Sequence, residues 1–215
     1  MTEALVLTSG GMDSAVCLYI ALAEHGPDGV EALFFDWGQR AVAEELGAAR
    51  NQCREAGLAE PVSIRLDFPY GGPLTDDSAS LPTGRTPSEI GSAGVARTFF
   101  PGRNIVMLAH AYGLAAARGH QVIYFGPNAD DAAGYPDCRA DFVKSLEVAC
   151  RQGTDSGISL AVPLIEMSKA DIVREGNRLR VPWDLTFSCY SPVDGRHCGR
   201  CDSCVLRSLA LSEEG

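Results

Sequence analysis

The chain lacks long apolar runs and any excess of positive charge. No stretch reaches the roughly 18 consecutive apolar residues that a membrane-spanning helix needs. The first apolar stretch, residues 4–7, has no cationic segment before it, which favours a first β-strand over a signal peptide. The net charge of −10 repels polyanions, although a local basic pocket could still hold one nucleotide. We therefore expect a cytoplasmic protein that binds neither a membrane nor a nucleic acid.

The chain also lacks internal repeats, and its 215 residues suit one α/β domain with a small appendage. Apolar runs predict strands at 4–7, 30–35, 62–66, 121–125 and 159–162. Segments with helical periodicity follow them, at 13–25, 40–56, 104–118, 140–151, 168–179 and 202–211. This alternation predicts a Rossmann-like α/β fold, a doubly wound parallel sheet of about five strands, with ligands at the carboxyl ends of the strands.

One long segment, residues 67–101, is rich in glycine and proline and shows no periodicity. Loops of this length in compact domains are usually functional or mobile. We interpret it as a lid-like insertion in an ATP pyrophosphatase-like α/β domain spanning residues 1–185. Residues 186–215, which hold four of the cysteines, are then a separate C-terminal zinc-binding motif.

A glycine-rich hexapeptide directly follows the first predicted strand and opens the first predicted helix. Its glycines let backbone amides approach an anion at a helix N-terminus, and its serines add hydroxyl donors. It has neither the lysine of a Walker A motif nor the third glycine of the dinucleotide fingerprint. We predict that it binds ATP, with Asp13 placed to hold Mg²⁺; the alternative is a tight turn in which Asp13 caps the helix. The predicted ATP-binding residues of this loop are Ser9, Gly10, Gly11, Met12, Asp13 and Ser14.

Four of the eight cysteines gather near the C-terminus, namely Cys189, Cys198, Cys201 and Cys204. The last three form two interlocked C-x-x-C pairs, a spacing that brings thiolates to one ion. Four thiolates without a water ligand are typical of a closed structural Zn²⁺ site. An iron–sulfur cluster and a redox dithiol are the alternatives. His197 adjoins a ligand and is either a substitute ligand or a solvated side chain.

Polar residues follow other predicted elements as well. Asp36 and Gly38 come after the second strand, where they either contact adenosine or form a simple turn. Arg103 and Asn104 open a helix directly after the insertion. Their position favours anion binding, with an ordinary surface helix start as the alternative.

The hexapeptide resembles the pyrophosphate loop of the N-type ATP pyrophosphatases, which split ATP between its α and β phosphates and leave AMP on the substrate. Further matching segments lie at 35–40, 74–77, 98–104, 126–131, 134–139, 163–165 and 168–171. Together with the four cysteines, they make residues 4 to about 210 similar to the 7-cyano-7-deazaguanine synthase family of queuosine-precursor biosynthesis. The segment at 134–139, Gly-Tyr-Pro-Asp-Cys-Arg, is far more specific than the loop.

This resemblance implies an ATP-dependent C–N ligase that adenylates the carboxylate of 7-carboxy-7-deazaguanine. Ammonia then displaces AMP to give an amide, and a second adenylation leads to the nitrile. The resemblance implies that ATP, Mg²⁺ and Zn²⁺ are required and that the chain forms a homodimer. The implied catalytic residues are Asp13, Arg103, Asp131 and Lys169, of which Lys169 also binds ATP. The implied substrate-binding residues are Arg103, Asn104, Asn128, Asp131, Tyr135, Asp137 and Arg139, although Asp137 is an equally good candidate for a helix cap.

The chain departs from the family pattern at Ala41, Ala132 and Ala133, and at Gly102. Three of these changes remove bulk or hydrogen-bonding groups beside the inferred substrate pocket. A wider pocket predicts an alternative product: an amide, or a conjugate of the deazaguanine acyl group with another amine, such as a peptide or protein. A second alternative is a nucleotide-binding zinc scaffold without turnover, against which the intact loop counts.

Overall fold

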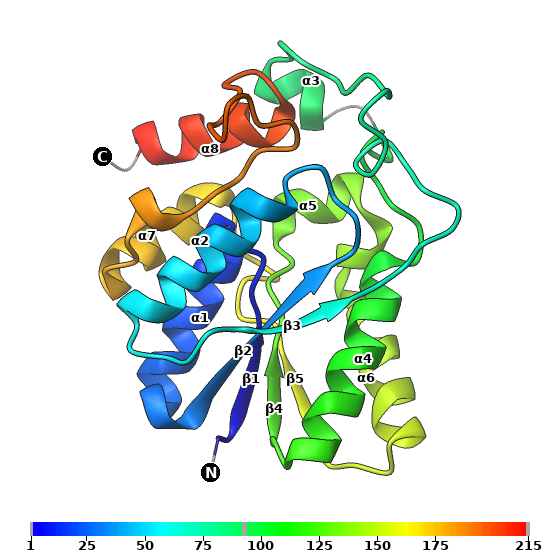
Figure 1. Ribbon diagram of the computed structural model, residues 1–215, viewed down its shortest axis with the longest axis vertical. Helices are drawn as coiled ribbons and strands as arrows, with labels where there is room; N and C mark the ends of the chain where they lie inside the picture. Colours follow the sequence, from blue (N-terminus) through cyan, green and yellow to red (C-terminus); the bar gives the residue numbers. More distant parts are fainter. Residues whose placement is uncertain (1, 92–93, 214–215) are drawn as a thin grey trace.

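The computed structural model describes residues 2–91 and 94–213. Five parallel strands form one sheet in the order β3-β2-β1-β4-β5. The switch point lies at β1, with β2 on one side of it and β4 on the other (Figure 1). Residues 92–93 of the predicted insertion and residues 214–215 of the predicted C-terminal motif lie outside the described residues.

The strands and the longer helices lie where the sequence predicts them. The strands are β1 (Ala4–Leu7), β2 (Val30–Asp36), β3 (Val62–Arg65), β4 (Val122–Tyr124) and β5 (Ser159–Ala161). The longer helices are α1 (Met12–His25), α2 (Val42–Glu55), α4 (Arg103–Arg118), α6 (Ala140–Gly153), α7 (Lys169–Leu179) and α8 (Asp202–Glu213). Ser168 caps α7 through a capping box with Asp171, as its sequence predicts.

Alternate residues of β1 supply two separate cores. Leu5 and Leu7 pack with α4 and α6 on one face of the sheet, whereas Ala4 and Val6 pack with α1 and α7 on the other. All four β1 residues are buried, because helices cover both faces (Figure 1). The predicted doubly wound sheet is therefore confirmed.

Two short helices were not predicted: α3 (Pro87–Gly91) inside the insertion and α5 (Ala129–Gly134) after β4. Each is too short to show a helical period. Asn128 caps α5, its side chain accepting a hydrogen bond from the backbone N–H of Asp131. Other three-residue turns, all of the 3₁₀ type, lie at Pro27–Gly29, Pro136–Cys138 and Trp183–Leu185.

Both carboxylates for which a capping role was the alternative fail to cap a helix. Gly11 is the N-cap residue of α1, so Asp13 lies inside the first turn. Asp137 lies within the turn Pro136–Cys138, and α6 begins only after its N-cap residue Arg139. Both side chains are therefore available for other contacts.

The insertion packs against the four-cysteine segment. The backbone N–H of Gly84 donates to the carbonyl oxygen of Arg200 over 2.9 Å, and Thr83 forms a β-bridge with Cys201. Arg85 forms an ion pair with Asp202 at the start of α8. As a result, α3 and α8 lie side by side beyond the carboxyl ends of the strands (Figure 1).

Within the described part of the chain, none of the helices has both the length and the apolar character needed to cross a bilayer.

Candidate active site

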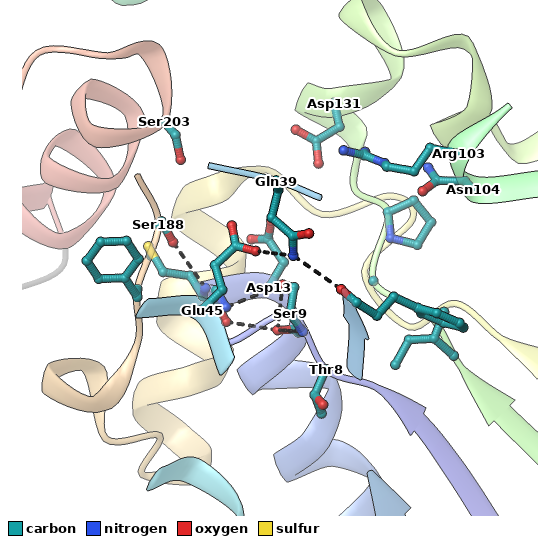
Figure 2. Close-up of a pocket in the computed structure, with 18 of the residues that line it drawn as sticks. Thr8, Ser9, Asp13, Gln39, Glu45, Arg103, Asn104, Asp131, Ser188 and Ser203 are labelled. Carbon is teal, nitrogen blue, oxygen red and sulfur yellow. Dashed lines mark hydrogen bonds between the residues drawn. The ribbon is translucent and has the colours of Figure 1, made fainter. Parts of the chain in front are cut away.

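A cavity of about 300 Å³ opens at the carboxyl ends of the strands. This volume lies at the lower end of the range for small-ligand pockets. The hexapeptide loop forms its floor. Figure 2 shows two groups facing each other above that floor: Arg103, Asn104 and Asp131 on one side, Ser188 and Ser203 on the other. The cavity therefore joins the α/β domain to the four-cysteine segment.

The loop has a shape that only glycine permits at position 10. Gly10 has φ of +78°, and a Cβ there would lie 2.4 Å from the backbone oxygen of Glu45 on α2. Ser14 Oγ accepts a hydrogen bond from the backbone N–H of Ser9 over 3.1 Å. The C-terminal segment closes over the same loop, because the Phe187 N–H donates to the Gly10 carbonyl over 2.8 Å. The first amides of α1 consequently face the cavity, in the arrangement that binds phosphate.

Asp13 belongs to a charged network that joins α1, α5 and α7. Lys169 Nζ lies 2.6 Å from Asp13 Oδ2 and 3.8 Å from Asp131 Oδ1. Asn128 Nδ2 donates to Asp131 Oδ2 over 2.6 Å and to Asp13 Oδ2 over 3.3 Å. Burial raises the pKa of Asp131, and Lys169 counteracts that rise. Burial opposes the charge of Lys169, yet the two aspartates raise its pKa above the ordinary value, so Lys169 stays cationic.

Asp13 also has the free oxygen that a cation requires. Its Oδ1 is buried and has no hydrogen-bond partner in the described chain, whereas its Oδ2 is held by Lys169 and Asn128. A buried carboxylate oxygen left without a partner is costly unless a ligand completes it. Since Mg²⁺ prefers carboxylate oxygens and bridges to phosphates, the donor set fits this ion.

Arg103 lies in the cavity wall among aromatic and polar residues, one of which, Tyr190, comes from the four-cysteine segment. The Arg103 guanidinium stacks 5.0 Å from the centre of the Trp37 ring, which orients it. Tyr135 Oη lies 2.6 Å from Thr98 Oγ1 and 3.3 Å from Tyr190 Oη. This wall offers a fixed cation and several hydroxyl groups to an anionic, planar substrate.

Asp137 lies behind this wall with one oxygen unsatisfied. Its Oδ2 is buried and has no hydrogen-bond partner among the described residues. Burial raises the pKa of Asp137, while Arg103 lowers it. Asn104 donates weakly to the neighbouring Cys138 thiol, at 3.8 Å.

The four C-terminal cysteines form a compact cluster. Their Sγ atoms all lie within 4.8 Å of one another, and those of Cys198 and Cys204 are 3.9 Å apart. A tetrahedral Zn²⁺ with bonds of about 2.3 Å requires thiolates about 3.8 Å apart, so the residues fit this metal. The cluster excludes His197, whose Nε2 accepts a hydrogen bond from the backbone N–H of Ser188. His197 is therefore not a substitute ligand; it is exposed, as the solvated alternative predicts.

A model of the family described as queuosine biosynthesis protein QueC matches residues 3–215. The chain belongs to this family. The 7-cyano-7-deazaguanine synthase of Myxococcus xanthus (strain DK1622) is 44% identical over 221 residues, covering 99% of this chain and 94% of the relative. The enzyme of the same name from Leptospira interrogans (serovar copenhageni, strain Fiocruz L1-130) is 41% identical over 219 residues, covering 99% and 88%.

A solved structure supports the fold of this QueC-family chain. The U34-tRNA thiolase NcsA from Methanococcus maripaludis, solved with its [4Fe-4S] cluster, aligns with a TM-score of 0.51 at 16% identity. The alignment covers 99% of this chain and 65% of NcsA. At this identity the likeness concerns the arrangement of strands and helices alone.

The predicted binding residues of this QueC-family chain divide into two groups. Those that line the cavity are Ser9, Gly11, Met12, Asp13, Ser14, Arg103, Asn104, Asp131, Tyr135 and Lys169. Among the described residues, those predicted but absent from its wall are Gly10, Asp36, Gly38, Asn128, Asp137 and Arg139. Asp36 Oδ1 accepts a hydrogen bond from the Gly38 N–H over 3.1 Å, the simple turn that was the alternative. Arg139 is exposed and donates to the Ala132 carbonyl oxygen.

Several residues that line the cavity were not predicted from the sequence. They come from the loop after β2, from α2 and from the C-terminal segment: Gln39, Glu45, Ser188, Tyr190, Ser203 and Arg207. Gln39 directly follows the predicted adenosine-contacting turn, and Glu45 lies seven residues after Gly38. The others are brought to the cavity by tertiary packing of the four-cysteine segment.

Glu45 is a carboxyl group with little to balance its charge. Gln39 Nε2 donates to Glu45 Oε2 over 2.9 Å and to the Phe35 carbonyl, which fixes the orientation of Gln39 (Figure 2). Glu45 forms no ion pair within the described residues. Burial raises the pKa of Glu45 from 4.5 to about 7, and the Gln39 hydrogen bond and Arg103 lower it less strongly.

Replacing Glu45 by glutamine should stabilise the fold at alkaline pH. The folded protein binds a proton at Glu45 more tightly than the unfolded chain, so the unfolding free energy falls as pH rises from 4.5 to about 7. The variant escapes this loss and should gain up to about 3 kcal/mol at pH 8 but less than about 1 kcal/mol at pH 5. Urea unfolding at both pH values measures this, with Glu44→Gln on the same helix as the control. An equal effect at the two pH values would contradict the assignment.

Proposed function

We propose that this chain is a 7-cyano-7-deazaguanine synthase, an ATP-dependent ligase of queuosine biosynthesis. It adenylates the carboxylate of 7-carboxy-7-deazaguanine and captures the acyl group with ammonia. The observation that carries this proposal is a phosphate-type loop opening on a cavity with basic and acidic groups, in a chain whose family match extends over residues 3–215.

In the first step, a carboxylate oxygen of the substrate attacks the α-phosphorus of ATP, and diphosphate leaves. Ammonia then forms a bond to the acyl carbon, AMP leaves, and a proton is released to give the amide. In the second round, the amide oxygen attacks the α-phosphorus of another ATP, and a second diphosphate leaves. Loss of AMP and of the remaining nitrogen-bound protons yields the nitrile. Adenylation replaces an oxide, a poor leaving group, by AMP in both rounds.

The residues of the cavity would serve this reaction chiefly by orientation and charge neutralisation. The amides of Ser9–Ser14 would hold the diphosphate part of ATP, and Asp13 would hold Mg²⁺, which shields the charge of the phosphates. Lys169 is held beside that site by Asp13 and Asp131. Arg103 would bind the substrate carboxylate. Asn104, Asn128, Asp131, Tyr135, Asp137 and Arg139 remain the proposed substrate-binding residues.

The two proposed parts of the chain divide this work. Residues 1–185 would carry the chemistry, with the insertion at 67–101 as its lid, and residues 186–215 would bind Zn²⁺. The four thiolates leave no position for water, so the ion would hold the C-terminal segment in place rather than take part in the reaction.

The departures from the family pattern do not reshape the cavity wall. Ala41 is buried, and neither it nor Ala132 nor Ala133 lines the cavity formed by the described residues. A wider pocket for a larger amine, on which the amide- or conjugate-forming alternative depended, therefore gains no support from them. We propose the nitrile as the product for that reason.

Mass spectrometry of the product tests this proposal. Purified enzyme is incubated with ATP, Mg²⁺, ammonium and 7-carboxy-7-deazaguanine. The proposal predicts the nitrile, with the amide as a transient species that disappears over time. An amide that accumulates without conversion would support the alternative, and an unchanged acid would reject both.

A further inference from the structure

We propose that Arg207, on the helix that begins inside the cysteine cluster, binds the diphosphate end of ATP and so makes nucleotide binding depend on that cluster. The inference rests on the proposed function for the identity of the anion. It identifies a binding residue in the C-terminal segment. It also explains why the cluster lies beside the cavity.

Arg207 lies at the cavity wall with most of its donors unused. Its Nη1 donates to Thr186 Oγ1 and its Nη2 donates to the Trp183 carbonyl oxygen over 2.8 Å. A guanidinium group has five N–H donors in a planar fork, so these two bonds orient the group and leave others free. The side chain lines the same cavity as the phosphate loop.

No carboxylate of the described residues pairs with Arg207, whose guanidinium interacts only at longer range with the charge of the Cys204 thiolate in the cluster. Within the described residues it forms no ion pair, although it is half-buried. By contrast, the cavity's Lys169 is already neutralised by Asp13 and Asp131. Charged side chains are rarely buried without a partner, because desolvation of the charge is costly. An anionic ligand in the cavity would supply the direct ion pair that no carboxylate provides.

The position of Arg207 determines which part of the bound nucleotide it would contact. Its partner Thr186 directly precedes Phe187 and Ser188, which bond to the phosphate loop through Gly10 and Met12. Figure 2 shows Ser203, from the same helix as Arg207, on the side of the cavity opposite Arg103 and Asp131.

The group that reacts with the acyl substrate is the α-phosphate, which must face the Arg103 wall. The departing diphosphate then extends over the loop toward α8. A planar guanidinium can bind phosphate oxygens in a bidentate manner, which suits it to this end of the nucleotide.

The cysteine cluster determines the position of Arg207. Helix α8 begins at Asp202, between Cys201 and Cys204, and Arg207 follows one turn after the last cysteine. Arg85 of the insertion pairs with Asp202 and adds a second anchor. A change in the cluster would therefore displace the guanidinium from the loop.

The test compares the binding of diphosphate and of AMP by calorimetry, using full-length protein with its metal. Arg207→Met removes the charge and keeps much of the stem, Arg207→Lys keeps a charge without the fork, and Arg196→Met is the control on the exposed part of the same segment. We expect Arg207→Met to bind diphosphate about 10- to 100-fold more weakly, AMP affinity to change less than about twofold, and Arg207→Lys to fall between. Zinc content should be unchanged in all of them.

Diphosphate affinity of Arg207→Met within about twofold of the wild type would overturn the inference. So would an equal loss of AMP and diphosphate affinity, or a loss of zinc, because either result marks a structural role. These outcomes are separable from a failure of the proposed function. A wild-type protein that binds diphosphate through Arg207 yet makes no nitrile would reject the synthase assignment alone.

Discussion

Replacing Asp13 by asparagine should slow diphosphate release by about two to three orders of magnitude. The substitution keeps the size of the side chain but removes the charge on Oδ1, the buried oxygen that has no protein partner in the described chain. It also removes the closest counter-charge of Lys169, which lies 2.6 Å from Oδ2. Loss of the Oδ1 charge weakens the binding of Mg²⁺ where the diphosphate leaves, and loss of the Lys169 partner removes the contact that holds the ammonium group in position.

A coupled assay for diphosphate measures this effect across a range of Mg²⁺ concentrations. Asp28→Asn, on an exposed turn away from the cavity, is the control and should behave as the wild type. Circular dichroism should show the same helix content in all three proteins. Unchanged turnover of Asp13→Asn would contradict a metal-binding role for this carboxylate.

Replacing Cys201 by serine should release the metal and unfold the C-terminal segment. Cys201 is fully buried, and its thiolate belongs to the cluster whose sulfur atoms lie within 4.8 Å of one another. Binding of a structural metal supplies folding free energy, so loss of one ligand weakens the fold of residues 186–213 as well as the metal site. The cavity would then lose its wall on that side, and ATP affinity should fall at least tenfold.

Elemental analysis and limited proteolysis test this expectation. The variant should contain far less than one zinc per chain and should be cleaved within the C-terminal segment. Cys150→Ser is the matched control, because this cysteine lies on α6 outside the cluster. A Cys201→Ser protein that keeps its full zinc content would contradict the four-thiolate site.

The sheet was predictable because its signals are local. Each strand is a short buried apolar run, and the polar loops that follow β1, β2 and β4 gather at one edge of any parallel sheet. The hexapeptide Ser9–Ser14 is local too, since its glycines, its hydroxyl groups and the helix start that follows them together predict an anion site. The cysteine cluster could also be predicted, from the spacing of its ligands.

The remainder of the cavity depends on contacts between distant segments. Arg207 follows Cys204 in a stretch that reads as an ordinary helix, and only the packing of α8 against the loop brings it to the wall. Glu45 lies on a helix with two other acidic residues, and its burial cannot be predicted from the pattern of charges. The short helix α5 was missed because six residues are too few to show a period, although its cap, Asn128, is a residue type that commonly starts helices.

Asp36 shows why the role of a polar loop residue is harder to predict. A polar residue at the carboxyl end of a strand favoured ligand contact, yet its side chain accepts a hydrogen bond from the N–H of Gly38 and closes a turn. Sequence position alone does not separate these two uses of an aspartate, because both require the same exposed loop.

The most direct test of the account is to identify the fragments of ATP that form when 7-carboxy-7-deazaguanine is added. Phosphorus NMR of the reaction mixture separates cleavage between the α and β phosphates from cleavage between β and γ. Adenylation of the substrate predicts AMP and diphosphate in equal amounts, formed only when the carboxylate substrate is present. The appearance of ADP with orthophosphate, or of no diphosphate in response to the substrate, would contradict it.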